Sequence, residues 1–222
     1  KHNGYSTSAW GKWHQTAVWE ANPSGPFTTW PMGQGFDKFY GFIGGETHQF
    51  FPALYDGNTA VEPALHSGYN LNDDLRQRAI EWMRLQKAVA PQKPFFVYFA
   101  PGATHAPHQV APEWVEPFTG QFDQGWDRLR QEIFERQLAT GVIPSGTLLT
   151  PRPQAIPAWD SLSEQQQRIA SRLMETYAGF AAQTDYEAGL LIDALQDMGE
   201  FDNTLFIYMV GDNGASSEGQ EY

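Results

Sequence analysis

Two short apolar runs, Phe95–Ala100 and residues 204–210, are each reached through a long helical pattern in the sequence. A continuous apolar run of this kind fits a strand that is covered on both faces, as in a parallel sheet. Parallel strands need long crossover connections, which helices commonly provide. The alternation therefore predicts a layered α/β domain with a mostly parallel central sheet flanked by helices, and it predicts both runs as parallel strands of that sheet.

The two helical patterns have recognisable starts and buried faces. Asn72 or Asp73 is expected to cap the first helix, and Ser163 with Gln166 forms the capping box of a second, longer helix that ends near Gly199. The apolar stripe of the first helix contains Leu75, Ala79, Trp82 and Met83. That of the second contains Ile169, Leu173, Tyr177, Phe180, Thr184, Ala188, Leu191 and Leu195.

The remaining segments show less regular patterns. Residues 15–70 are rich in Gly, Pro and aromatic side chains and predict a long irregular segment. Its aromatic side chains either cover the core or line a substrate cleft. Residues 123–139 predict a charged surface helix, and residues 141–157 predict exposed turns.

Composition limits the possible partners of the chain. The 222 residues are 41% hydrophobic and 14% aromatic, which is enough to bury a core, and their net charge is −12. Nucleic-acid binding needs a basic surface and is not expected, whereas local cations in a cleft can still bind a small anionic molecule. No apolar run approaches the roughly 20 residues that span a bilayer. The absence of cysteine excludes disulfides and thiolate metal sites.

The strongest candidate for chemistry is the stretch of residues 4–14, which ends in Gly11, Lys12, Trp13 and His14. It places a fixed positive charge beside a titratable imidazole. In an extended segment, residues two apart point the same way, so Lys12 and His14 could face one ligand. The pattern indicates an anion-handling loop, with a surface turn of chance neighbours as the alternative.

This stretch matches Gly-Tyr-x-Thr-x-x-x-Gly-Lys-Trp-His at every fixed position, and it thereby resembles the second signature of the sulfatase family. Residues 98–108 resemble the family segment that carries a substrate-binding histidine just before x-Pro, here His105. Residues 210–214 resemble the Asp-Asn metal pair of the family, here Asp212 and Asn213. The three segments occur in family order, and the resemblance covers essentially the whole chain.

The resemblance implies an alkaline-phosphatase-like α/β fold with one partial catalytic domain over residues 1–222. The motif Cys/Ser-x-Pro-x-Arg, whose first residue becomes formylglycine, does not occur in the sequence. The early Asp-Asp metal pair and a later lysine of the family are also missing. We therefore expect an internal piece of an enzyme, truncated at both ends, with the formylglycine upstream of Lys1. We expect this piece to be inactive alone.

The resemblance further implies an arylsulfatase-like sulfuric ester hydrolase acting on small-molecule sulfate esters. In the complete enzyme, a formylglycine hydrate on Ca²⁺ would attack sulfur. Lys12 and His105 would stabilise charge on the sulfate and leaving-group oxygens, and His14 would assist proton removal. Asp212 and Asn213 would supply hard oxygen ligands to calcium; without the resemblance, they are a turn after a strand.

Two other functions share these motifs. One is a phosphonate monoester or phosphodiester hydrolase of the same superfamily, and the other is a non-catalytic anion-binding module. His108 lies three residues after His105, but a zinc site would need a further ligand. Glu46 and Asn70 are possible cleft residues, and Asp185 is expected to be a packing or capping partner.

Overall fold

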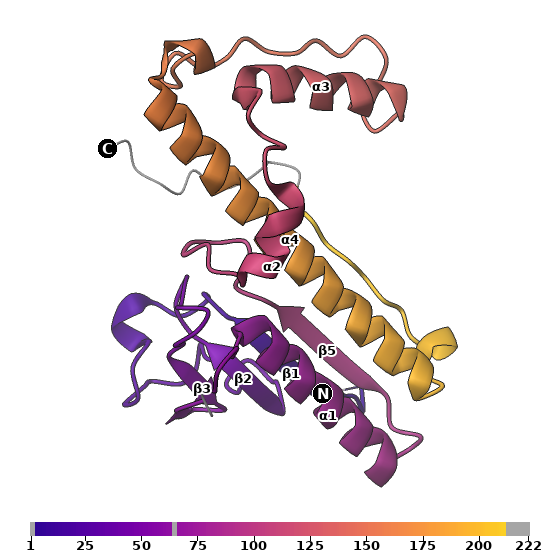
Figure 1. The fold of residues 1–222 in the computed structure, drawn as a ribbon. Coiled ribbons are helices and arrows are strands. Elements are labelled where there is room, and N and C mark those ends of the chain that lie inside the picture. Colours follow the sequence, from indigo (N-terminus) through magenta and orange to yellow (C-terminus); the bar gives the residue numbers. More distant parts are fainter. Residues whose placement is uncertain (1–2, 64–65, 212–222) are drawn as a thin grey trace. The chain divides into compact units, whose positions relative to one another are not determined.

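The computed structural model describes residues 3–63 and 66–211, which form two compact units. One unit comprises Lys1–Ala111 together with Phe180–Tyr222, and the other comprises Pro112–Gly179. Figure 1 shows the sheet in the first unit, with helices packed on it. No helix formed by the described residues is both long enough and apolar enough to cross a membrane.

The sheet has its parallel strands at the centre. In chain order, its strands are β1 (Ser6–Lys12), β2 (Lys38–Phe42), β3 (Leu54–Asp56), β4 (Thr59–Val61) and β5 (Phe95–Ala100). Their order across the sheet is β4-β3-β2-β1-β5. Strand β1 pairs in parallel with β2 and with β5, whereas β3 and β4 pair in antiparallel fashion. The prediction of an α/β domain with helices flanking a mostly parallel sheet is confirmed.

Helix α1 (Leu71–Val89) covers one face of the sheet and buries the stripe that its sequence predicts. Leu75, Ala79 and Met83 all lie in the main core. Trp82 packs against this core, and its ring meets that of Trp10 edge-on, with centroids 6.3 Å apart. The long crossover between β2 and β5 therefore passes through a helix whose spacing of apolar residues matches the surface that it covers.

The irregular segment after β1 covers the opposite face of the sheet. Trp30 is fully buried there with Phe39 and Ile43, and Phe36 packs against this second cluster. Most of these aromatic side chains thus cover the core. The 3-10 helix η1 (Val18–Glu20) is an exception, because it leaves its tryptophan exposed.

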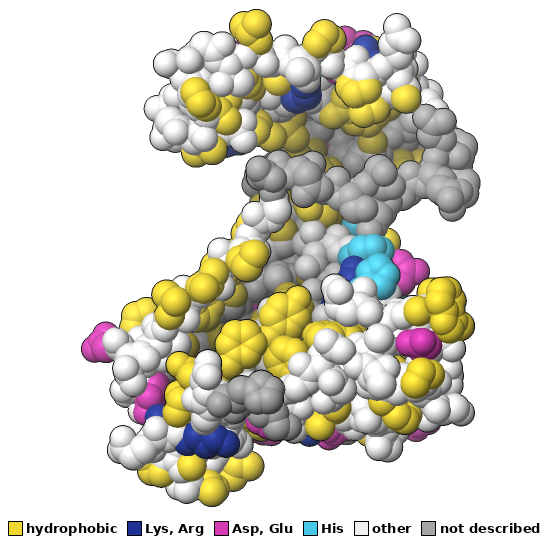
Figure 2. Space-filling view, turned by 180° about the vertical axis from the view of Figure 1, so that it is seen from behind, with side chains coloured by type: hydrophobic (Ala, Val, Ile, Leu, Met, Phe, Trp, Pro, Cys, Tyr) yellow, Lys and Arg dark blue, Asp and Glu magenta, His cyan; other side chains and the backbone are white. Residues whose placement is uncertain are grey.

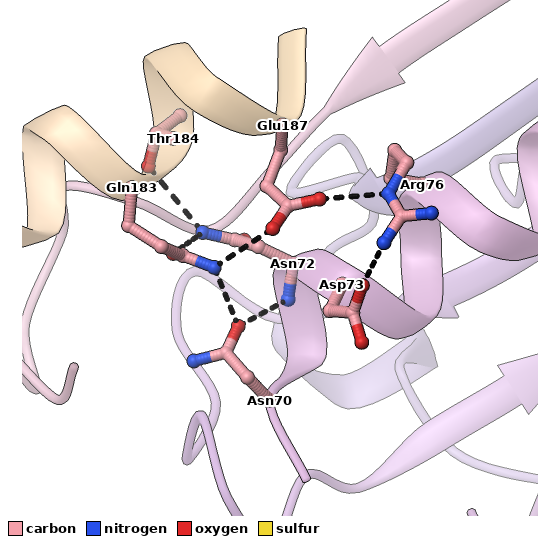
Figure 3. A network of polar contacts seen from close by, with 7 residues as sticks. All are labelled: Asn70, Asn72, Asp73, Arg76, Gln183, Thr184 and Glu187. Atoms are coloured by element: carbon pink, nitrogen blue, oxygen red, sulfur yellow. Dashed lines mark hydrogen bonds and ion pairs between the residues drawn. The ribbon is translucent and has the colours of Figure 1, made fainter. Parts of the chain in front are cut away.

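A polar network fixes the start of α1 to helix α4 (Glu164–Asp197), as Figure 3 shows. Asn70 is the N-cap, because its side chain accepts the N–H of Asn72 at 2.9 Å. The predicted cap at Asn72 or Asp73 is therefore wrong by two or three residues. The side chain of Asn72 is instead fully buried and donates to Gln183 at 2.9 Å.

The same network contains a buried ion pair. Glu187 of α4 is almost completely buried, and its carboxylate accepts a hydrogen bond of 2.8 Å from Nε of Arg76. Arg76 also contacts Asp73 on its own helix, and Gln183 donates to Glu187 at 3.3 Å. A buried carboxylate needs such partners, since its desolvation is otherwise costly.

The second unit contains short and long helices around a tryptophan pair. Its elements before α4 are α2 (Pro112–Val115), η2 (Glu116–Phe118), α3 (Gly125–Ala139) and η3 (Trp159–Ser161). The rings of Trp126 and Trp159 meet edge-on, with centroids 4.9 Å apart. The capping box is confirmed, because Ser163 N–H donates to Gln166 Oε1 at 2.9 Å and Gln166 N–H donates to Ser163 Oγ at 3.3 Å.

Residues 204–210, which follow the 3-10 helix η4 (Phe201–Asn203), correct a sequence prediction. They form no strand, so the prediction that they are a parallel strand of the sheet that contains β5 is wrong for the described part of the chain. Leu205, Ile207 and Met209 are 84%, 68% and 88% exposed, whereas Phe206 packs against the main core. No described strand pairs with this run to supply hydrogen bonds to its backbone.

Two further expectations about burial are also wrong. Strand β5 is not covered on both faces, since Phe96 and Tyr98 are about half exposed. In α4, Ile169 and Leu173 are exposed, because this part of the helix turns a different face inward. That face includes the buried carboxylate of Glu175, which accepts the N–H of Gly120 at 2.8 Å.

The strand ends depend on a glycine in β1. Gly11 has φ +98°, and a Cβ at this position would lie 2.1 Å from the carbonyl oxygen of Ala100 in β5. A Cβ on Gly41 of β2 would lie 2.0 Å from the carbonyl oxygen of Gly11. No side chain fits at either point, so glycine is the residue that lets the three backbones approach.

Gly11→Ala is therefore expected to destabilise the fold by more than about 2 kcal/mol, from backbone strain and from the clash with Ala100. Gly141→Ala is the matched control, because Gly141 also has positive φ, at +73°, but has open space around its Cβ position. It should cost only about 1 kcal/mol. Urea unfolding of both variants measures the difference, and equal losses would contradict the close-approach argument.

Arg76→Met is expected to lower the free energy of unfolding by about 3 kcal/mol, because it leaves Glu187 buried without its cation. Adding Glu187→Met should restore most of this loss. The exposed pair of Arg128 and Glu132 on α3, 2.9 Å apart, is the control. There Arg128→Met should cost less than about 0.5 kcal/mol. A double variant as unstable as Arg76→Met would show that the buried charge is not the cause.

Candidate functional site

Polar side chains gather where the three parallel strands end. Gly11 in β1 stands opposite Gly41 in β2 and Ala100 in β5, so the three strands reach the same edge of the sheet together. In open α/β sheets, ligands bind outside this carboxyl edge. The segments that follow β1, β2 and β5 carry the candidate residues.

Lys12 and His14 lie at the end of β1. Lys12 is half-buried and pairs with Phe42 in the ladder, and His14 follows on the surface. The N–H of His14 donates to the carbonyl of Ile43 at 3.0 Å, which keeps this segment against the end of β2. Most of the predicted anion-handling loop is instead the buried strand β1, and only its last residues follow the strand; that they handle an anion stays a prediction.

His14 has an unusual backbone conformation. Its φ is +50°, a left-handed value that non-glycine residues rarely adopt. A residue held in this region costs about 1–3 kcal/mol, and such strain clusters at functional sites. Because His14 is not in an extended conformation, the rule that residues two apart point the same way does not apply to Lys12 and His14.

The segment after β2 brings the other two strand ends together. A Cβ on Gly45 would lie 3.0 Å from the imidazole carbon Cε1 of His14. The next residue, Glu46, places its carboxylate oxygen Oε2 3.6 Å from Nδ1 of His105. Neighbouring residues of one loop therefore contact His14 and His105.

His105 follows β5 in a turn held by its own backbone. Its N–H donates to the carbonyl of Gly102 at 3.0 Å, and Nδ1 lies 3.0 Å from the carbonyl oxygen of Ala106. Figure 2 shows histidine side chains gathered on one surface beside a basic and an acidic side chain. Lys12, His14 and His105 thus lie at one edge of the sheet; that they share a single anion stays a prediction.

The sequence did not single out the loop after β2. The sequence indicates Glu46 as a possible cleft residue and gives no recognisable pattern for His48, Gln49 and Gln109, although all lie at this edge. A prediction of strand β2 would have placed these residues just after a strand end. That strand is hard to recognise in the sequence, because it is short and follows a long aromatic segment. Asn70 proves to be the N-cap of α1, and it also lines a surface cavity at the start of that helix.

The metal prediction falls on Asp212 and Asn213, which lie outside the described residues. Within residues 3–63 and 66–211, no group of three or more His, Cys, Asp or Glu side chains could hold a metal ion. His105 and His108 therefore belong to no such group among the described residues. The described residues therefore do not make a metal site by themselves.

Two surface cavities are formed by other residues. One of about 300 Å³ is formed along α4 by Gln165, Arg168, Ile169, Arg172 and Leu173. The other, of about 180 Å³, lies at the start of α1 and is lined by His66, Tyr69, Asn70, Asp73, Asp74, Gln77 and Arg78. Neither is lined by Lys12, His14 or His105, although the second includes Asn70.

The second cavity adjoins a polar cluster with a structural role. Asp74 accepts hydrogen bonds from the hydroxyls of Tyr40 and Tyr69, at 2.7 and 2.9 Å. Burial, reinforced by this carboxylate, raises the pKa of both tyrosines. Asp185 plays a similar part in α4: burial and its carboxylate raise the pKa of Tyr208, which fits the predicted packing role.

Comparison with known proteins decides the family. The family model described as Sulfatase matches residues 1–222. The chain belongs to the sulfatase family. This sulfatase chain is 32% identical over 229 residues to an arylsulfatase from Klebsiella aerogenes, covering 97% of the chain and 46% of that protein. It is 28% identical to an uncharacterized sulfatase of Schizosaccharomyces pombe, covering 96% of the chain and 39% of the relative.

Solved structures share the fold of this sulfatase chain. A putative sulfatase from Bacteroides fragilis has a TM-score of 0.59 at 20% identity, over 91% of the chain and 40% of that structure. A protein solved with its substrate D-glucosamine-2-N,6-O-disulfate has a TM-score of 0.53 at 17% identity, over 91% of the chain and 46% of that structure. The alkaline-phosphatase-like fold is therefore confirmed. The sulfatase chain spans about half the length, or less, of these relatives.

Gly45→Ala is expected to displace the His14 imidazole by a few tenths of an ångström, because the added methyl group would lie 3.0 Å from the ring. The side-chain NMR signals of His14 should shift, whereas those of His66, which lines the cavity at the start of α1, should not. Unchanged His14 signals would show that the ring does not pack against Gly45.

Proposed function

We propose that the full-length protein is an arylsulfatase-like sulfuric ester hydrolase that acts on small-molecule sulfate esters. The observation that carries the proposal is the arrangement of Lys12, His14 and His105 at one sheet edge, linked through Gly45 and Glu46. It is supported by membership of the sulfatase family and by similarity to an arylsulfatase. The sulfated sugar bound by one structural neighbour fits the same substrate class.

Each of the three residues has a distinct part in this proposal. Lys12 offers a fixed positive charge to the sulfate oxygens. His105 donates a hydrogen bond to the leaving-group oxygen, where negative charge develops as the ester bond breaks. His14 accepts a proton during release of sulfate, because an imidazole can exchange protons near neutral pH.

The nucleophile and the metal complete the proposal from outside the described residues. A formylglycine upstream of Lys1 would supply the nucleophile, and Ca²⁺ would supply further charge stabilisation, with oxygen ligands from Asp212 and Asn213. Calcium prefers six to eight oxygens, so further ligands would have to come from elsewhere in the full-length protein.

The full-length enzyme should hydrolyse an aryl sulfate, and Lys12→Ala and His105→Ala should each lower kcat/KM by about 10²–10³. Lys93→Ala is the control, since Lys93 precedes β5 at the opposite edge of the sheet. The 222-residue chain alone should show no turnover, even with added calcium, because catalysis needs the covalent nucleophile.

The same assay separates the competing functions. Faster turnover of an aryl phosphonate or phosphodiester than of the aryl sulfate would favour the other hydrolase class. Binding of inorganic sulfate without turnover of any of these esters would favour a non-catalytic anion-binding module. Equal activity of the 222-residue chain and the full-length enzyme would contradict the assigned nucleophile.

A further inference from the structure

The loop after β2 and the loop after β5 are joined by two side chains. Nδ1 of His48 faces the backbone N–H groups of Phe50 and Phe51, each at 3.1 Å. On the other side of the ring, Nε2 lies 2.8 Å from the side-chain amide of Gln109. The oxygen of that amide accepts the N–H of Gln49 at 2.9 Å. Gln109 is thus held through its amide oxygen by Gln49, and its amide nitrogen lies beside the preceding residue, His48.

This connection rests on a rigid part of the fold. Gln49 is 1% exposed, and its carbonyl accepts the N–H of Leu71, the first residue of α1, at 2.9 Å. Its side-chain nitrogen donates to the carbonyl of Thr47 at 3.2 Å. The same nitrogen lies 3.4 Å from the Cβ position of Gly102. A buried residue therefore anchors the connection between α1 and the two loops.

His105 lies between two fixed points of the loop after β5. Its backbone is bonded to Gly102 on one side, and Gln109 is held four residues later on the other. Its ring faces the carboxylate of Glu46, which belongs to the same loop as His48. The contacts of His48 and Gln109 therefore tie the backbone that follows His105 to the loop after β2.

We propose that Gln109 and His48 are positioning residues for His105 in the reaction stated under Proposed function, on which this inference rests. They act through His105 and make no contact with the substrate. A catalytic group must be placed closely, since a displacement of about 1 Å can cost about 10²-fold in rate. Supporting hydrogen bonds of this kind keep a functional side chain in its productive geometry.

The test uses the full-length enzyme with Gln109→Met, which keeps the length of the side chain but removes both amide contacts. We expect kcat for an aryl sulfate to fall by about tenfold or more, while the thermal midpoint changes little. Gln131→Met is the matched control, because Gln131 donates to Glu135 on the exposed face of α3, at 2.8 Å. The control should keep the activity of the wild type.

The His105→Ala background separates positioning from general support of the fold. If Gln109 acts through His105, adding Gln109→Met to His105→Ala should leave kcat unchanged, because the group that it positions is already absent. A further loss in that background, or unchanged activity of Gln109→Met alone, would overturn the inference. So would a loss of activity that follows a parallel loss of thermal stability. A wild-type enzyme inactive on every sulfate ester would instead overturn the proposed function, and this inference with it.

Discussion

The close approach of three backbones at Gly11 is the constraint on which the candidate site depends. Because no side chain separates Gly11 from Gly41 and Ala100, the ends of β1, β2 and β5 meet at one edge. The loops that leave this edge must then run side by side. Candidate residues that are up to about a hundred positions apart in the sequence thereby come to lie at the same edge of the sheet.

Much of this arrangement could be predicted from the sequence, because some patterns report directly on local physics. The stripe through Leu75 and Met83 predicted α1, and Ser163 with Gln166 predicted the start of α4. The apolar run of β5 predicted a strand. In the same way, the Gly-Lys-Trp-His string pointed to Lys12 and His14 because its residue types suit an anion.

Other parts could not be predicted because they depend on distant neighbours. Strand β2 is short, and its pairing with β1 joins segments about thirty positions apart. Residues 204–210 are a continuous apolar run typical of a buried strand, yet a strand also needs a partner for its backbone groups, which a local pattern does not specify. Glu46, His48 and Gln109 acquire their contacts only when the two loops meet.

The left-handed backbone of His14 has a consequence for how this chain can change. At φ +50°, glycine or asparagine would fit with less strain than histidine, so either replacement should make the folded chain more stable while removing the imidazole. Replacements that raise the stability of the fold at this position therefore remove the proposed catalytic group. A search for thermostable variants would tend to discard the side chain that the proposed reaction needs.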